Sequence, residues 1–497
     1  MARIDKGVAG RGKSAGQRVP PEAGEHFTEN REEVLRNLFE PSAPQSERRD
    51  RGKALRASLP RAELALHRRV PGSVDPVAII KAQNATRIQG LVPVRMGRMM
   101  ASPFGFLRGS AAVMAADLAA HPTTGVEVIA CGDMHLSNFG LFASAERNLV
   151  FAINDFDEVH PGPWEWDLKR LAASAAVAAR YIGGDDTDAA LVAFETVRRY
   201  VEWINIYSRM GILETWYSRI DEDEILAICP PDLKKVTKKL LARARARGHI
   251  STMERLTHRV EGETRLIEDT PIIVRETHTQ DGVPIDEALN QMLRAYIASL
   301  TTDRRELLKR YRVADVVRKV VGVGSVGLDC WVLYLQGDTD EDPLFLQVKE
   351  ARESVLAPHV RTRVMLTNQG HRVVSGQRVI QGSPDIFLGW GPLDGQPGRQ
   401  YYVRQLADMK GSLKFIEGER TRLAQLLSYV RLCGRALALA HAKSGDPSVI
   451  AGYCGRSEAL PEAISRFALA YMAQTFEDHD RLEEAARRGE VPVAMGL

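Results

Sequence analysis

Over long parts of this chain, apolar residues recur at intervals of three and four positions, the spacing that gives an α-helix one buried face. The segment at residues 166–181 is rich in alanine, and the segment at 420–442 carries a stripe of leucines. Helices are predicted in this way over residues 78–120 (two helices), 166–181, 188–207, 230–300, 358–381, 420–442 and 461–488. The pattern therefore predicts a protein that is built mainly of helices.

Short runs that are apolar at almost every position interrupt the helical pattern in two places, and such runs are typical of buried β-strands. One pair of runs, at residues 126–130 and 149–153, brackets a polar loop. A second group follows in close succession at residues 313–323, 330–335, 344–349, 386–390 and 401–406. Because short connections join antiparallel strands, this second group predicts a small antiparallel sheet.

We therefore expect an α+β protein with two lobes. A large helical lobe would combine residues 75–300 with residues 411–497, and a small antiparallel β lobe would cover residues 305–410. Residues 1–60 are rich in Arg, Glu, Gly, Pro and Ser and poor in aromatics, so we expect a mobile N-terminal arm with a short helix near residues 32–39.

The composition excludes several classes of protein. With 44% hydrophobic and 26% charged residues, the chain is typical of a soluble globular protein, and a net charge of +3 gives no reason to expect a nucleic-acid partner. The five cysteines show no CxxC spacing, which argues against a zinc site and suits a reducing cytoplasm. We find neither a membrane-length apolar run nor a secretory signal, so we expect a cytoplasmic protein without a membrane partner. The sequence indicates no particular oligomeric state.

A glycine-rich segment, Gly322-Val323-Gly324-Ser325-Val326-Gly327, lies between two predicted strands. A dinucleotide-binding site needs a helix after the glycines, whereas a kinase loop lies in a hairpin and closes over nucleotide phosphates with its backbone N–H groups. Lys349 ends the next predicted strand, where kinases place the lysine that contacts the α- and β-phosphates. We therefore expect ATP to bind at Gly322, Gly324, Ser325, Gly327 and Lys349.

In kinases a carboxylate on the following helix holds this lysine. Here no Asp or Glu occurs between Arg361 and Gln381. The partners that remain open for Lys349 are Gln369, Gln377, Glu350 and Glu353.

A second group of polar residues, Gly132-Asp133-Met134-His135-Leu136-Ser137-Asn138, occurs far upstream. Asp133 and Asn138 have the spacing of a kinase catalytic loop, in which the Asp orients the attacking hydroxyl and the Asn binds Mg²⁺. Asp155 follows an apolar strand and can bridge Mg²⁺ to the phosphates, with Asp157 as a second candidate ligand. We therefore expect a Mg²⁺-dependent transfer of the γ-phosphoryl group from ATP to a hydroxyl at Asp133.

These motifs resemble the aminoglycoside and choline phosphotransferases, whose pattern is HGDxHxxN, then D-F-[DE], then a glycine and D-L-A. The matching segments are 131–138, 154–157, Gly162 and 166–168, with Cys131 in place of the first His. The resemblance implies that Asp167 buttresses the catalytic loop and that His135 orients it through hydrogen bonds.

The order of the motifs differs from that of these enzymes. In the phosphotransferases a long helix ending in Leu-Ala-x-Leu-His leads directly into the catalytic loop. Here the segment 437–442, Leu-Ala-Leu-Ala-His-Ala, ends the helix and no catalytic loop follows it. The resemblance therefore implies a circularly permuted protein-kinase-like fold that is cut before its catalytic loop, which is feasible because the termini of a domain often lie close together.

From about residue 94 to residue 473 the chain also resembles a bacterial family of unknown function that is grouped with kinase-like folds. The motifs that carry this resemblance are FLRG, GDMHLSNFG, NDFDE, PWEWDLKRL, GVGSVG, LQVKEA and FLGW. It implies the fold and supplies no acceptor for the phosphoryl group.

Other interpretations stay open. The missing helix carboxylate favours a nucleotide-binding regulator, and an inverted nucleotide would make the chain an AMP transferase. In a metallophosphoesterase, Asp133 and His135 would bind a dinuclear metal, but the further histidine motifs of that class are lacking. Arg108 precedes a buried helix and would either pair with a phosphate or Asp155, or hold the N-terminal helices through a structural ion pair.

Overall fold

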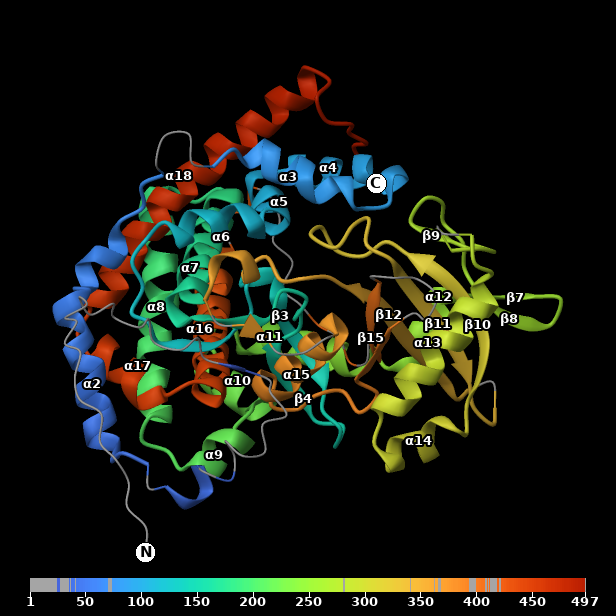
Figure 1. Ribbon diagram of the computed structural model, residues 1–497, viewed down its shortest axis with the longest axis horizontal. Coiled ribbons are helices and arrows are strands. Elements are labelled where there is room, and N and C mark those ends of the chain that lie inside the picture. The colour runs from blue at the N-terminus through green and yellow to red at the C-terminus, as the bar shows by residue number, and fades with distance from the viewer. Residues whose placement is uncertain are drawn as a thin grey trace, which may run out of the picture.

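The chain folds into a helical part and a part built around an antiparallel sheet, which lie on opposite sides of the molecule (Figure 1). The computed structural model describes residues 25–26, 35, 37–40, 42–69, 74–279, 282–339, 341–361, 363–364, 368–392, 399–406, 409, 411, 418–419 and 422–496. The core of the helical part extends into the other part through buried residues of β12 (Pro343–Ala351), α15 (Gln369–Ile380) and β15 (Gln400–Gln405), and the sheet has further cores of its own. We call the two parts the helical lobe and the sheet lobe.

The helical lobe combines segments from both ends of the described chain. Its elements are α2 (Gln45–Ser58), η1 (Arg61–Ala65), α3 (Pro76–Ala85), η2 (Gln89–Leu91), α4 (Val92–Met100), α5 (Pro103–Gly109), α6 (Ala111–Ala119), β2 (Glu127–Ala130), η3 (Leu136–Asn138), β3 (Phe139–Ala143), β4 (Leu149–Ile153), β5 (His160–Pro163), α7 (Trp164–Tyr181), α8 (Asp186–Tyr207), α9 (Ile212–Tyr217), β6 (Ile220–Asp221), α10 (Glu222–Ile228), α11 (Lys234–Arg245), α16 (Leu423–Ser444), α17 (Pro447–Cys454) and α18 (Ala459–Arg487).

The centre of this lobe is formed by α8, which packs against α7, α16 and α18. Small side chains allow the close approach: the alanines of α7 from 172 to 179 are fully buried, and a Cβ on Gly434 of α16 would lie 2.4 Å from the Thr196 carbonyl oxygen of α8. Among the described helices, only α16 is long and apolar enough to cross a membrane. It is largely buried in this core, as the central helix of a soluble protein is.

The sheet lobe contains a six-stranded antiparallel sheet with the order β14–β15–β12–β11–β10–β9. Its elements are α12 (His249–Leu256), β7 (Thr257–Val260), β8 (Glu263–Leu266), β9 (Ile273–Val274), α13 (Ile285–Ser299), α14 (Thr302–Leu308), β10 (Arg312–Lys319), β11 (Cys330–Gln336), β12 (Pro343–Ala351), η4 (Ala357–His359), β13 (Arg363–Val364), α15 (Gln369–Ile380), β14 (Gly389–Pro392) and β15 (Gln400–Gln405). A short strand, β1 (Glu25–His26), pairs with β13. α15 packs on β14 and β15 and also against α16, so it lies between the two lobes.

From α11 onward, the chain passes between the lobes twice. It enters the sheet lobe after α11 and returns after β15, between Leu406, which bonds to Phe345 in the sheet, and Gly411, which bonds to Leu141 of β3. At the returning passage the Met409 N–H donates a hydrogen bond of 2.9 Å to the Arg247 carbonyl oxygen of the entering passage. The two connections therefore touch each other.

The predicted strands and the long central helices are found close to their predicted positions, although the strand predicted at 386–390 begins only at Gly389. Residues 78–120 were expected to hold two helices, but this segment contains four, α3 to α6, because Ser102 caps a further helix that begins at Pro103.

The structure differs in three further places. Residues 230–300 are not all helical, because the Glu261–Gly262 turn has φ of +51° and +86° and closes the β7–β8 hairpin. β9 then joins the main sheet, so this sheet draws on residues before 305. Of the helix expected over 358–381, only α15 forms.

The third difference concerns the predicted mobile arm. α2 lies within residues 1–60 and packs on α17, where a Cβ on Gly52 would come 2.0 Å from the Val449 carbonyl oxygen. A glycine in the contact face allows this docking in a segment whose overall composition is polar. The short helix expected at 32–39 lies partly outside the described residues, and so does most of the chain before residue 35.

Candidate active site

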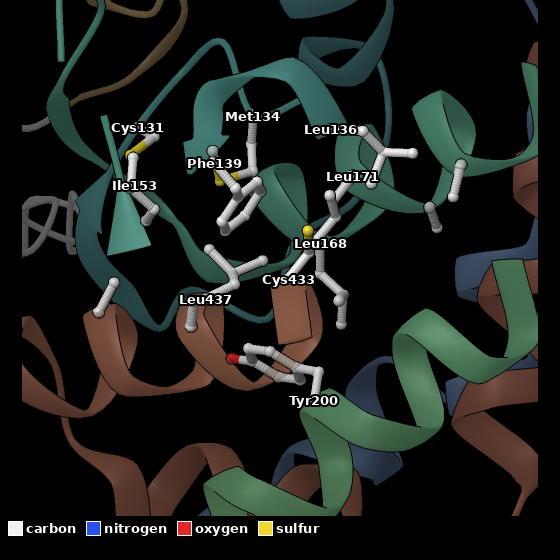
Figure 2. Close-up of a cluster of buried hydrophobic side chains, with 14 of the residues drawn as sticks. Cys131, Met134, Leu136, Phe139, Ile153, Leu168, Leu171, Tyr200, Cys433 and Leu437 are labelled. Atoms are coloured by element: carbon white, nitrogen blue, oxygen red, sulfur yellow. The ribbon is translucent and has the colours of Figure 1, made fainter. Parts of the chain in front are cut away.

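The loop of residues 131–138, which we call the Asp133 loop, connects β2 to β3 and has an apolar and a polar side. The apolar side chains of the loop are Cys131, Met134 and Leu136. Figure 2 shows them, with the neighbouring Phe139, packed in the core against residues of α7, α8 and α16. The polar side chains, Asp133, His135 and Asn138, line a cavity. The core therefore anchors the loop and leaves its polar groups facing the cavity.

Asp167 of α7 holds the start of this loop. Its carboxylate accepts hydrogen bonds from the backbone N–H groups of Cys131, at 2.6 Å, and Gly132, at 3.0 Å. His441, near the end of α16, lies 3.5 Å from Asp167 and shares a hydrogen bond of 2.8 Å with the Tyr200 hydroxyl. Asp167 thus has the structural role that the resemblance to the phosphotransferases implies.

Arg170, one turn after Asp167, fixes the Asp133 side chain. Its Nε and Nη2 donate to Asp133 Oδ1 at 3.0 and 2.5 Å, and its Nη2 also donates to the Leu107 carbonyl oxygen at 2.7 Å. Sequence reasoning missed Arg170, although a position three residues after Asp167 lies on the same helix face. Burial raises the pKa of Asp133, and the charge of Arg170 acts in the opposite direction.

The second oxygen of Asp133, Oδ2, lies 3.6 Å from His135 Nε2. Burial lowers the pKa of His135 well below its usual value, so the imidazole is neutral. Since Arg170 occupies Oδ1 and the imidazole beside Oδ2 is neutral, Oδ2 is the oxygen of Asp133 that can accept a proton from a bound hydroxyl.

Asn138 and Asp155 present oxygen atoms to the same cavity. The Asn138 Nδ2 donates to the Asp133 carbonyl oxygen at 2.6 Å, and this bond fixes which end of the amide carries the oxygen. Burial by itself raises the pKa of Asp155, but the charges of Lys349 and Arg404 and the hydrogen bond from the Asp157 N–H together outweigh burial, so the pKa lies below its usual value. An ionised carboxylate and an amide oxygen are ligands that Mg²⁺ prefers, so these residues fit a magnesium ion.

Lys349 of β12 reaches from the sheet lobe to the loop that follows β4. Its Nζ forms an ion pair with Asp157 Oδ2, and the other oxygen of Asp157 accepts a hydrogen bond from the Tyr402 hydroxyl at 2.7 Å. Burial by itself lowers the pKa of Lys349, yet the charges of Asp155 and Asp157 raise it above its usual value. The lysine is therefore charged, and two segments that are far apart in sequence meet at one point.

Lys349 pairs with none of the four residues considered from the sequence. Glu350 pairs instead with Arg352 at 2.7 Å, Glu353 is exposed, and both glutamines bond to side chains of α15. All four of these residues follow the lysine in the sequence, whereas its partner, Asp157, lies far upstream. The assignment of Asp157 to Mg²⁺ stays a prediction, because in this structure its two oxygens contact Lys349 and Tyr402.

On α15, the helix after β12 in which a comparison with kinases would place a carboxylate, the structure has the buried Arg372. Its guanidinium donates to the backbone carbonyl oxygens of Asp157, at 2.8 Å, of Arg352, at 2.7 Å, and of Val159. The helix therefore supplies a cation that holds the Asp157 loop, and the loop supplies the carboxylate that holds Lys349. The absence of Asp and Glu from this helix was the signal in the sequence that the carboxylate for Lys349 comes from another segment.

The glycine-rich loop, residues 322–327, connects β10 to β11 and lies over the Asp133 loop. At Gly324 a Cβ would lie 3.4 Å from the Arg108 carbonyl oxygen and 4.0 Å from Asp133 Oδ2. These are ordinary van der Waals distances, so the backbone of the loop lies directly over the carboxylate. The Ser325 hydroxyl is turned back to the Val321 carbonyl oxygen, at 3.1 Å.

Three carbonyl groups of this loop are held by the segment from α3 to α4, and we call these contacts the loop clamp. The bonds run from Arg98 Nη1 to Gly322 at 2.7 Å, from Arg87 Nη1 to Val326 at 2.6 Å and from the Ile88 N–H to Gly327 at 2.9 Å. The helical lobe thereby fixes the position of the loop.

Two cavities, each of about 220 Å³, lie along β12 on either side of the Lys349–Asp157 pair. The first lies under the glycine-rich loop and collects most of the predicted site residues: Arg108, Asp133, His135, Asn138, Asp155, Asp157, Gly322, Gly324 and Ser325. Gly327 and Lys349 do not line it. The second cavity is lined by Gln347, Gln377 and Arg404, whose Nε donates to Gln347 at 2.9 Å.

The histidines weigh against a dinuclear metal site. Among the described residues, His135 is the only histidine that lines either cavity. His160 contacts the Pro161 carbonyl oxygen, and His371 stacks on Trp390. The described histidines thus provide no cluster around Asp133 and His135.

The chain matches no curated protein and no solved structure. A family model described as an uncharacterized protein conserved in bacteria (DUF2252) matches residues 87–485. This span includes the Asp133 loop, the Asp155 carboxylate, the glycine-rich loop and Lys349. The chain therefore belongs to this bacterial family, DUF2252.

Proposed function

We propose that this chain is an ATP- and Mg²⁺-dependent phosphotransferase that moves the γ-phosphoryl group of ATP to a hydroxyl acceptor. One observation carries the proposal: Gly324 lies over Asp133 while Lys349 pairs with the loop that bears Asp155. A glycine-rich loop, a lysine, a catalytic Asp and a metal-binding pair are the groups that kinases bring together for phosphoryl transfer.

Each group has a role in this proposal. The backbone N–H groups of the glycine-rich loop and the Lys349 ammonium bind the phosphates, and Asp133 Oδ2 accepts the proton of the acceptor hydroxyl. Asn138 and Asp155 would hold Mg²⁺, which neutralises phosphate charge when bound. Arg170 keeps Asp133 oriented, because both of its hydrogen bonds to this side chain go to Oδ1 and leave Oδ2 available to the acceptor hydroxyl.

A circularly permuted kinase-like frame would account for the chain order. This proposal is supported by the end of α16, which lies against β2, the strand that leads into the Asp133 loop. A Cβ on Gly445, the residue after α16, would lie only 2.7 Å from Val128 Cγ1 of β2. A chain joined there would run from the helix into the catalytic loop, as in the phosphotransferases that the motifs resemble.

The second cavity favours AMP transfer as a second candidate function. Its half-buried Arg404 and the amides of the buried Gln347 and Gln377 are groups that can bind phosphate oxygens. A triphosphate with its γ-phosphate toward Arg404 in the second cavity would bring its α-phosphate to the first cavity, which contains Asp133. The products would then be an adenylylated acceptor and pyrophosphate.

The test is a screen for ATP consumption with Mg²⁺ against pools of metabolites, with Asp133→Ala as the blank. Release of ADP supports phosphoryl transfer, pyrophosphate supports AMP transfer, and ATP binding without turnover would indicate a regulator. Asp155→Asn should abolish metal-dependent turnover without unfolding the chain, whereas the exposed substitution Asp50→Asn should not change it. Full activity of the Asp155 variant would refute the assignment.

A further inference from the structure

Arg108 is unusual among the arginines of the first cavity. It lies in the last turn of α5 and lines the cavity, and its Nε is buried without a hydrogen bond. Its side chain forms no hydrogen bond or ion pair with any residue that the structure describes. The other two arginines of this cavity are engaged, because Arg87 donates to the Val326 carbonyl oxygen and Arg352 to the Glu350 carboxylate.

A guanidinium in such surroundings is poorly stabilised by the protein alone. Burial lowers the pKa of Arg108, while the charges of Asp133 and Asp155 act in the opposite direction without contacting it. Arginine nevertheless stays protonated in proteins, so the side chain keeps its charge. Arg108 as a whole is half-buried, but its buried Nε has no hydrogen-bond partner, and a buried polar group without a partner is costly. A bound anion would supply the missing partner.

The position of Arg108 indicates which anion this is. Its carbonyl oxygen lies under the glycine-rich loop, 3.4 Å from the place of a Cβ on Gly324, and its side chain enters the cavity shared by Asp133 and Asp155. The structural ion pair considered from the sequence is not formed among the described residues. An anion held between the catalytic carboxylate, the metal ligands and the glycine-rich loop is the transferring phosphate.

We propose that Arg108 binds the γ-phosphoryl group of ATP during its transfer, an inference that rests on the proposed function. In this step the acceptor oxygen bonds to the γ-phosphorus, and the bond from that phosphorus to the bridging oxygen of ADP breaks. The acceptor proton passes to Asp133. Arg108 donates hydrogen bonds to the phosphoryl oxygens and exchanges no proton, since its planar fork of N–H groups matches two oxygens at once.

The test compares the affinities of Mg·ATP and Mg·ADP for the wild-type chain and for Arg108→Gln, measured by calorimetry without an acceptor. Charged hydrogen bonds contribute about 1.5–3 kcal/mol, so ATP binding should weaken roughly 10- to 100-fold while ADP binding changes little. Arg108→Lys should recover part of the loss. Arg98→Ala, which removes one bond of the loop clamp, serves as the matched control and should weaken both nucleotides equally.

The outcomes separate the two proposals. An ATP-to-ADP affinity ratio that is the same in Arg108→Gln and in the wild type would overturn the role of Arg108 and leave the proposed function standing. The ratio stays the same if neither affinity changes or if both fall equally, and an equal fall would mean that Arg108 contacts the α- or β-phosphate. If the wild-type chain binds neither nucleotide, both proposals fail. The melting temperature of each variant is measured first, and Arg108→Lys replaces Arg108→Gln if the latter is unfolded.

Discussion

The Lys349–Asp157 ion pair is a direct test of how the two lobes are joined. The Lys349 side chain is 1% exposed and that of Asp157 is 19% exposed, so water cannot replace the carboxylate at the lysine. Removing one member of a buried pair costs about 3–5 kcal/mol. For Asp157→Asn we expect a loss near the lower end, about 3 kcal/mol in the free energy of unfolding, because Asp155 still attracts the lysine.

A double-mutant cycle isolates this interaction. Lys349→Met should cost a similar amount, and the double variant should be more stable than the sum of the single effects predicts, by about 2 kcal/mol. The measurement is denaturant unfolding followed by tryptophan fluorescence in EDTA, so that no metal contributes. The exposed pair Lys53–Asp50, with side chains 53% and 68% exposed, is the control and should show a coupling below about 0.5 kcal/mol. Additive effects at Lys349 and Asp157 would refute the reasoning.

Three further predictions follow from single residues. Burial raises the pKa of Glu158 to about 7, so the folded chain should lose stability as the pH rises from about 4.5 to 7. Compared with Glu158→Gln, the wild type should lose up to about 3 kcal/mol of its free energy of unfolding between pH 5 and 8. The same pH dependence of stability in both proteins would contradict this. Asp167→Asn should weaken the two bonds to the Asp133 loop and speed hydrogen exchange of the Cys131 and Gly132 amides, whereas unchanged rates would remove its buttressing role. Gly52→Ala should lower the melting temperature, because its Cβ would overlap a backbone oxygen of α17 at 2.0 Å, and an unchanged melting temperature would show that α2 does not depend on this contact.

The sequence predicted those parts of the structure that depend on local patterns. The buried strands β11 and β12 and the long helices α7, α8 and α16 follow from apolar spacing, because each of them buries a continuous apolar face. The hairpin β7–β8 did not follow, since its strands are largely exposed and its turn depends on two positive φ angles. Docking of α2 was missed because it depends on the close approach of Gly52 and on polar contacts, such as those of Arg56 to the backbone of α17, and not on an apolar stripe.

For the candidate site, motifs predicted which residues gather but not how their charges pair. Asp133, Asn138 and Asp155 line one cavity with the glycine-rich loop, as the motif spacing indicated. The Lys349–Asp157 pair could not be read from spacing, because the two residues come from different lobes. Arg372 was missed for a related reason: it acts on backbone carbonyl oxygens, which leave no trace in the sequence.

The contact between Met409 and Arg247 determines how these lobes can move. Two covalent links between rigid bodies usually suppress rotation, but links that cross at one point leave a single pivot about which the bodies can still turn. The sheet lobe can therefore tilt away from the helical lobe without stretching either link. Such a tilt would have to break the loop clamp, the Lys349–Asp157 pair and the Arg372 bonds to the Asp157 loop, and it would also pull the apolar side chains of α15 out of the helical-lobe core, so we expect only small openings without nucleotide.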